Sequence, residues 1–171
     1  RAGLDVLLVD RAVFPREKPC AEYLSPEAGR DLEELGVLAE VEAAGAQQLA
    51  GMRIVSDDGA DVTGRFAAAH DFTPYRPYGL AVRRSVLDTI LVRAAERAGV
   101  TVRTGVALER VIVEGGMVCG AALRVGGRTW DELSRVLVGA DGLNSRVARQ
   151  LGLARSGRPL RLALMSHLSV L

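Results

Sequence analysis

The residues best suited to chemistry stand where apolar segments end. The almost wholly apolar run at 4–9 ends at Asp10. Such a run is typical of a parallel strand buried on both faces. In dinucleotide-binding folds, an acidic residue at such a strand end accepts hydrogen bonds from both hydroxyls of an adenosine ribose. The alternative is an ordinary aspartate that makes a turn, since no glycine-rich loop precedes Asp10 in this sequence.

The run Gly-Ala-Asp-Gly-Leu-Asn-Ser-Arg-Val-Ala-Arg at 139–149 is more specific. Small residues before Asp141 let the backbone approach a ligand closely, and Asp141 and Gly142 form a turn. Asn144 or Ser145 can cap the helix that follows. The start of that helix offers backbone N–H groups to a phosphate. A strand-to-helix turn with a good cap explains the same residues without a ligand.

The remaining polar candidates are weaker. Cys20 has no histidine nearby in sequence, so we expect it to pack rather than to act as a nucleophile. Arg16 and Lys18 could make their loop electropositive, but a solvated loop explains them equally well. His70 and His167 are isolated, and we find no catalytic triad, paired catalytic carboxylates or metal cluster in the sequence.

Apolar periodicity predicts the elements that position these residues. Pro26 and the capping Ser25 before it begin a helix that Gly36 can end. Asp57-Asp58-Gly59 predicts a hairpin. Further helices are expected at about 38–48, 85–98 and 144–151. Strands are expected at 4–9, 52–56, 60–66, 100–104, 106–113, 117–125, 128–130 and 135–138, and in the apolar tail, with loops at 11–24 and 67–78.

Composition excludes several function classes. The chain has 171 residues, of which 49% are apolar and 25% charged, with a net charge of +1. These values predict a globular protein without a strong field for nucleic acid or anionic membranes, and no apolar run is long enough to span a membrane. Two cysteines give no disulfide framework, so we expect a cytoplasmic protein. The chain opens Arg-Ala-Gly and is expected to be a fragment.

Three motifs carry a resemblance to a known superfamily. The run at 139–149 resembles the second fingerprint of the flavin-dependent monooxygenases and halogenases. Residues 15–26 resemble the "K-x-C-G-E-x-L-S-P" loop of its geranylgeranyl-reductase-like branch, and 84–88 is similar to its "R-x-x-L-D" helix start. The resemblance covers residues 3 to about 153. Ala21 replaces the usual glycine of the branch, and Ala148 stands where the superfamily often has arginine, with Arg149 next.

The resemblance implies an α/β fold: a Rossmann-like, glutathione-reductase-like FAD-binding domain with an inserted antiparallel β meander, truncated at both ends. Residues 1–153 would form part of the FAD-binding domain, with inserted β segments at about 51–83 and 106–130. Residues 154–171 would begin a substrate domain.

The resemblance also assigns residues to the ADP half of FAD. Asp10 would bind the adenosine ribose, with Arg11 beside the ADP portion. The backbone of Leu108 would contact adenine. Asp141 and Gly142 would lie near the pyrophosphate.

Four residues are assigned to the flavin half. Arg84 would reach the phosphate or ribityl region, where a guanidinium suits bidentate contact with phosphate. An arginine at a helix start is slightly disfavoured by the helix dipole, which favours this functional interpretation. Lys18, Cys20 and Glu22 would lie on a loop close to the flavin.

The function implied is that of an FAD-dependent oxidoreductase, of reductase or monooxygenase type, that acts on a hydrophobic small molecule with NAD(P)H as electron donor. Because the flavin performs the redox chemistry, no catalytic side chain is named. The fragment alone is expected to be inactive, to fold poorly and to bind FAD weakly. The alternatives are an NAD(P)H-dependent aromatic hydroxylase and a non-catalytic remnant of the FAD fold. A nicotinamide-only dehydrogenase fits least, because the run at 139–142 has no role there.

Overall fold

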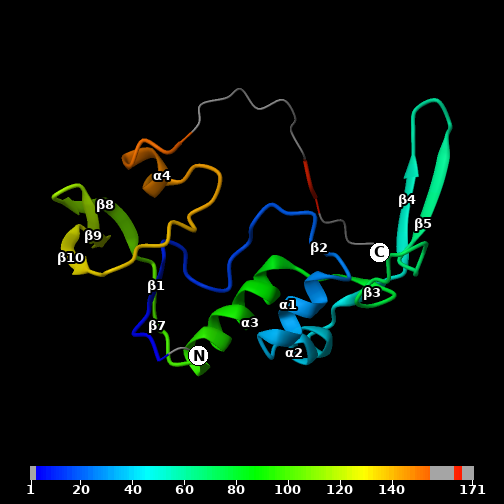
Figure 1. Cartoon of the computed structure of the whole chain (residues 1–171), viewed down its shortest axis with the longest axis horizontal. Helices are drawn as coiled ribbons and strands as arrows, with labels where there is room; N and C mark the ends of the chain where they lie inside the picture. Colours follow the sequence, from blue (N-terminus) through cyan, green and yellow to red (C-terminus); the bar gives the residue numbers. More distant parts are fainter. Residues whose placement is uncertain (1–2, 155–163, 167–171) are drawn as a thin grey trace. The chain divides into compact units, whose positions relative to one another are not determined.

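The computed structural model describes residues 3–154 and 164–166. The chain divides into two compact units (Figure 1). The first consists mainly of Phe14–Val100, and the second of Leu7–Val13 and Thr101–Leu164. Most of the apolar tail in which a strand is expected lies outside the described residues. The domain boundary near residue 153 stays a prediction.

Three helices belong to the first unit: α1 (Ala28–Glu34), α2 (Leu38–Ala43) and α3 (Arg84–Arg97). The helix α1 begins at Ala28 with Glu27 as its N-cap, two residues later than the predicted start at Pro26, although the hydroxyl of Ser25 accepts the backbone N–H of Ala28 at 3.3 Å. The expected helix over 38–48 is shorter than predicted. Gly45, at φ +93°, turns the chain, and the following residues form a strand instead.

The strands of the first unit are short or exposed. β2 (Tyr23–Leu24), β6 (Gly79–Ala81) and β3 (Gln47–Leu49) form an antiparallel sheet in the order β2-β6-β3, with Leu80 opposite both Leu24 and Gln48. None of these three strands was predicted. The expected hairpin is confirmed as β4 (Gly51–Val55) and β5 (Asp61–Arg65), which Figure 1 shows extending away from the helices of this unit.

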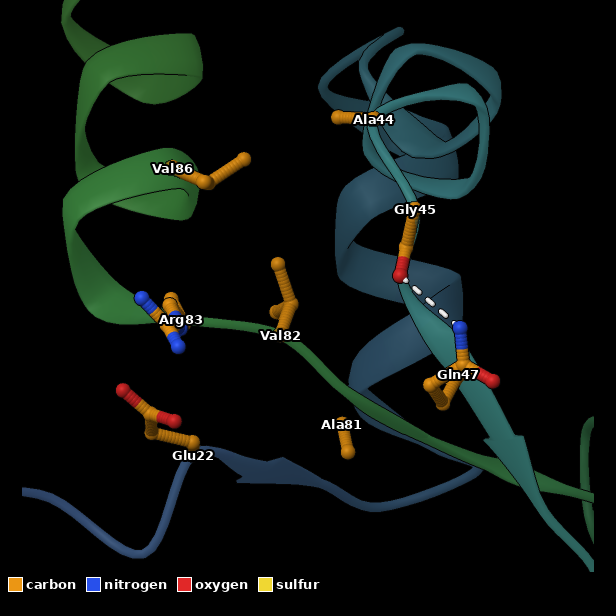
Figure 2. Close-up of a pocket in the computed structure, with 8 residues that line it drawn as sticks. All are labelled: Glu22, Ala44, Gly45, Gln47, Ala81, Val82, Arg83 and Val86. Carbon is orange, nitrogen blue, oxygen red and sulfur yellow. Dashed lines mark hydrogen bonds between the residues drawn. The ribbon is translucent and has the colours of Figure 1, made fainter. Parts of the chain in front are cut away.

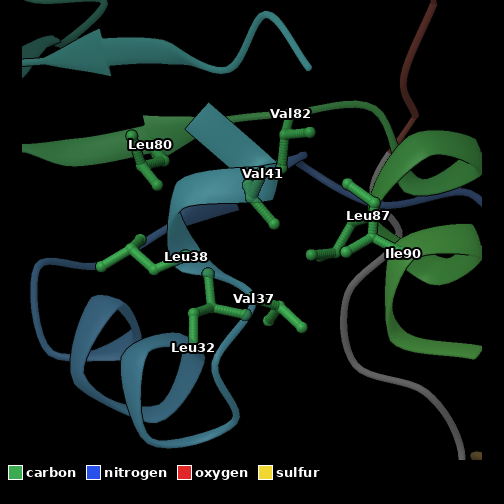
Figure 3. Close-up of a cluster of buried hydrophobic side chains, with 8 residues drawn as sticks. All are labelled: Leu32, Val37, Leu38, Val41, Leu80, Val82, Leu87 and Ile90. Carbon is green, nitrogen blue, oxygen red and sulfur yellow. The ribbon is translucent and has the colours of Figure 1, made fainter. Parts of the chain in front are cut away.

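One apolar core holds the helices of the first unit to β6 and the segment after it (Figure 3). Val41 of α2 is fully buried at its centre. The buried members are Leu32, Val37, Leu38, Val41, Leu80, Val82, Leu87 and Ile90. The α3 helix therefore has one face fixed by packing, and this fixes the direction of its other side chains.

The second unit begins with a parallel pair. β1 (Leu7–Asp10) lies beside β7 (Thr101–Thr104), with Asp10 opposite Thr104. The parallel strand is confirmed, but its residues are only partly buried rather than buried on both faces. In the described part of the chain β1 has a single neighbouring strand, so one of its edges is not covered by the sheet.

The predicted meander is confirmed as β8 (Ala107–Glu114), β9 (Met117–Val125) and β10 (Arg128–Leu133). Its core joins Val106, Ala121 and Leu123 with partly buried side chains of β1, β8 and β10, among them Trp130. The predicted strand over 135–138 is wrong. Val136 and Val138 are 76% and 78% exposed, because no strand of the described residues pairs with this segment.

The helix α4 (Arg146–Gln150) is shorter than the expected 144–151. The side chains of Asp141 and Ser145 cap its first turn. The Oδ2 atom of Asp141 accepts the backbone N–H groups of Arg146 at 2.6 Å and Val147 at 3.4 Å. Its Oδ1 atom accepts the Ser145 hydroxyl at 2.5 Å, and Ser145 Oγ accepts the N–H of Ala148 at 3.0 Å. The N–H groups that were expected to be open to a phosphate are therefore occupied. Ser145 is confirmed as the cap.

The small residues of this segment serve the same turn. A Cβ atom at Gly139 would lie 2.8 Å from Cβ of Val147 in α4, which is too close for any other residue. Gly142 has φ +84°, a conformation that L side chains rarely adopt. Close packing of α4 therefore accounts for Gly139, and the turn accounts for Gly142, without a ligand.

Among the described helices, none is long and apolar enough to cross a membrane.

Replacing Val41 by Ala should lower the free energy of unfolding by about 2 kcal/mol, because two buried methyl groups are lost and a cavity remains. Val62→Ala is the matched control, since Val62 in β5 is 64% exposed. Its effect should stay within about 0.5 kcal/mol. Urea denaturation measures both, and equal effects would contradict the assigned core.

Asp141→Ala should destabilise the second unit in a pH-dependent way. Burial opposes ionisation of Asp141 and is the largest single influence on its pKa, but its hydrogen bonds with Ser145, Arg146 and Val147 together outweigh burial and lower the pKa. A lowered pKa stabilises the fold above the ordinary aspartate value of about 3.9, and this contribution disappears as the pH falls through the folded-state value. At pH 7 we expect a loss of up to about 1 kcal/mol, typical of a helix cap.

Thermal melting followed by circular dichroism at pH 7 and pH 3 tests this expectation. The difference in melting temperature between the parent and Asp141→Ala should narrow at the lower pH. Glu114→Ala removes an exposed carboxylate of the same unit and should show no such trend. If the difference in melting temperature is the same at pH 3 as at pH 7, the capping carboxylate of Asp141 is not its cause.

Candidate functional site

A polar cluster of the first unit surrounds Arg84, the first residue of α3. Its guanidinium forms a two-pronged ion pair with Asp88, one turn along the helix. Nε donates to Oδ1 and Nη2 donates to Oδ2, both at 2.9 Å. Residues four apart lie on the same helix face, so the helix itself brings the pair together.

The loop before β2 supplies the next members. The Oε1 atom of Glu22 accepts the backbone N–H of Arg84 at 3.4 Å, and the carbonyl of Glu22 accepts the N–H of Val82 at 3.0 Å. Glu22 has φ +55°, which is uncommon for a residue with a side chain. Pairing of β2 with β6 therefore holds this carboxylate at the first turn of α3.

Cys20 contacts the same cluster, so it does more than pack. Its sulfur accepts the backbone N–H of Glu22 at 3.4 Å. This hydrogen bond lowers the pKa of the thiol; burial opposes the shift, and the neighbouring guanidinium of Arg84 reinforces it. Burial works to lower the pKa of Arg84, but hydrogen bonds with Cys20 and Asp88 outweigh it and raise that pKa. Arg84 is therefore a permanent positive charge.

Arg16 adds a second guanidinium. Its Nη2 atom lies 3.3 Å from Oδ2 of Asp88, and its side chain is 22% exposed, as is that of Arg84. Lys18 lies on the same loop and is exposed. Two arginines from separate segments thus converge on one carboxylate.

A cavity of about 350 Å³ lies beside this cluster in the same unit. Its apolar lining includes Val82 and Val86, and Glu22 belongs to both the cavity and the cluster. Figure 2 shows the Glu22 carboxylate and the Arg83 guanidinium at the same end of the cavity, with Gln47 on the other side donating to the carbonyl of Gly45 at 3.2 Å. The cavity thus combines apolar walls with one pair of opposite charges.

The candidates of the second unit make local contacts. Oδ1 of Asp10 accepts the backbone N–H of Ala12 at 2.8 Å, which is the turn expected of an aspartate that ends a strand. Arg11 is exposed. The carbonyl of Leu108 accepts Nη1 of Arg146 at 2.8 Å, which ties α4 to β8. Neither contact tests the ribose role of Asp10 or the adenine role of Leu108.

The predicted cofactor residues therefore divide between the two units. Lys18 and Arg84 belong to the first, and Asp10, Arg11, Leu108, Asp141 and Gly142 belong to the second. Within the first unit the structure adds Asp88, which contacts Arg84, and Arg16, which contacts Asp88; neither contact was predicted. The spacing of four between Arg84 and Asp88 on a predicted helix was the signal that could have revealed the pair.

Comparison with known proteins bears on this arrangement. The family model described as "FAD binding domain" matches residues 1–168. The chain is 30% identical over 150 residues to 1H-pyrrole-2-carbonyl-(peptidyl-carrier protein) brominase of Pseudoalteromonas luteoviolacea, covering 88% of this chain and 34% of that protein. It is also 30% identical over 162 residues to digeranylgeranylglycerophospholipid reductase of Methanosarcina acetivorans, covering 92% and 37%.

Among solved structures, the myxobacterial chondrochloren halogenase is 30% identical and superposes with a TM-score of 0.77, covering 86% of this chain and 34% of that one. The Rossmann-like FAD-binding fold expected from the sequence is thereby confirmed, as is the resemblance to geranylgeranyl reductases and halogenases. The chain spans 34% and 37% of the curated relatives described above. On the match to residues 1–168, this chain belongs to the FAD binding domain family.

Proposed function

We propose that this chain is the cofactor-binding part of an FAD-dependent oxidoreductase, of reductase or monooxygenase type, that acts on a hydrophobic small molecule with NAD(P)H as electron donor. The observation that carries the proposal is the Arg84 guanidinium, permanently charged and held by Asp88 at the start of α3, in a chain of the FAD binding domain family.

The residues present suit the chemistry of FAD. A guanidinium fixed in one direction matches a phosphate with parallel hydrogen bonds, so Arg84 would hold the phosphate or ribityl region. Asp10 ends a parallel strand, the position at which an acidic residue of a dinucleotide-binding fold would accept the ribose hydroxyls. Exposed Arg11 and Lys18 would add positive charge.

When bound, the flavin supplies the redox chemistry, and the chain supplies position and charge. Arg84 binds and orients the cofactor. Glu22 holds the loop with Cys20 against the first turn of α3, and the cavity beside it has an apolar wall at Val82 and Val86. No catalytic side chain is proposed.

A halogenase is the second candidate, and the similarity to the brominase and to the chondrochloren halogenase favours it. A reductase, a hydroxylase and a halogenase differ in their need for oxygen and halide. A reductase consumes NAD(P)H and a prenyl-type alkene without oxygen, whereas a hydroxylase responds to a phenol and oxygen, and a halogenase also requires halide. NADPH oxidation by the intact protein, with and without oxygen and bromide, separates them.

The decisive test is the affinity of the intact protein for FAD. Arg84→Gln and Asp10→Asn should each weaken binding about tenfold or more, because each removes hydrogen bonds to or from a charged group. Arg93→Gln and Asp57→Asn are the matched controls. Arg93 is exposed on the same helix, Asp57 is exposed in the hairpin turn, and both changes should leave binding unaltered.

Flavin absorbance and the quenching of flavin fluorescence measure these affinities. We expect the parent protein to be yellow, with its FAD site fully occupied. A colourless, folded parent that stays colourless with added FAD would refute the proposal and leave a remnant that kept only the fold.

A further inference from the structure

Asp88 is an unusual residue for its position in the fold. It is only 8% exposed and directly follows Leu87 on α3, whose buried side chain belongs to the apolar core of the first unit. An ionised carboxylate at such a place is costly unless it is paired and hydrogen-bonded. Packing alone therefore does not explain why an aspartate occupies this position of α3.

The contacts of Asp88 supply that reason. Both of its oxygens accept from Arg84 at 2.9 Å, and Oδ2 also lies 3.3 Å from Nη2 of Arg16. The bidentate geometry fixes the plane of the Arg84 guanidinium as well as its position. The second contact joins the loop that carries Arg16 to the first turns of α3. One carboxylate thus orients one arginine and anchors another.

The charges at the start of α3 also favour the pairing of Arg84 with Asp88. An arginine at the first position of a helix faces the positive end of the helix dipole, which disfavours it. The carboxylates of Asp88, through the side chain, and Glu22, through the backbone N–H, both offset that cost. Arg84 and Arg16 together carry one positive charge more than Asp88 neutralises.

We propose that Asp88 is a positioning residue of the cofactor site: it holds the guanidinium of Arg84 in the orientation that receives the FAD phosphate or ribityl group. This inference rests on the proposed function and adds to it a residue that would not touch FAD. Arg16 keeps the carboxylate paired when Arg84 is replaced, so Arg84 and Asp88 can be varied separately.

Asp88→Asn in the intact protein tests the inference by FAD titration. The uncharged amide cannot accept both N–H groups of the fork, so FAD affinity should fall about tenfold, close to the loss from Arg84→Gln. Glu96→Gln is the matched control, because it removes one negative charge from an exposed position of the same helix and should leave the affinity unchanged. Circular dichroism of each protein without FAD establishes that the fold is retained.

The double variant separates positioning from a general structural role. In an Arg84→Gln background, Asp88→Asn should change FAD affinity by no more than about twofold, because its effect passes through the arginine. A full tenfold loss in that background would mean that Asp88 supports the fold and not Arg84. Unchanged affinity of the single variant Asp88→Asn would also overturn the inference.

Arg84→Lys covers the case in which Asp88→Asn does not fold. Lysine keeps the charge but lacks the planar fork that Asp88 binds, so affinity should again fall about tenfold. Binding equal to that of the parent would show that charge alone suffices and would refute the positioning role. The proposed function fails separately, if Arg84→Gln itself binds FAD as well as the parent does.

Discussion

The need of one buried carboxylate for positive charge organises the polar part of the first unit. Asp88 lies on a helix face that the apolar core fixes in direction, so its partners must come to it. Arg84 reaches it along the same helix, and Arg16 reaches it from a loop far away in the sequence. A buried, charge-paired carboxylate of this kind restricts which conformations the loop can adopt. A conformation that removes either arginine would leave the buried carboxylate with one ion pair fewer, which is unfavourable.

The second unit uses its acidic residues differently. Asp10 and Asp141 both accept backbone N–H groups within a few residues of themselves, in a turn and in a helix cap. Such hydrogen bonds join residues that are close in sequence, so they depend little on distant packing. The motif around Asp141 is therefore explained first by the stability of the strand-to-helix turn, and any contact with a dinucleotide would be added to a segment that is already ordered by its own side chains.

Local patterns predicted the fold well wherever an element is long. The hairpin β4–β5, the helix α3 and the meander β8–β10 follow from turn residues and periodicity that lie within one segment. β2, β3 and β6 are two or three residues long and exist only because they pair with each other, so nothing in their own sequence marks them. The error at 135–138 has the same origin: an apolar run predicts a strand only if a partner strand is present. In the candidate site, Arg84 was found from its motif, but the roles of Asp88 and Arg16 required a three-dimensional contact.

The distribution of aromatic side chains has a practical consequence. The only tryptophan of the chain, Trp130, packs against the core of the second unit, whereas all three tyrosines, Tyr23, Tyr75 and Tyr78, lie in the first. Indole emission, excited at long wavelength, thus originates in one unit alone, and phenol absorbance originates in the other. The chain carries a separate natural chromophore for each unit, so the order in which the two units lose their structure can be followed without attaching any label.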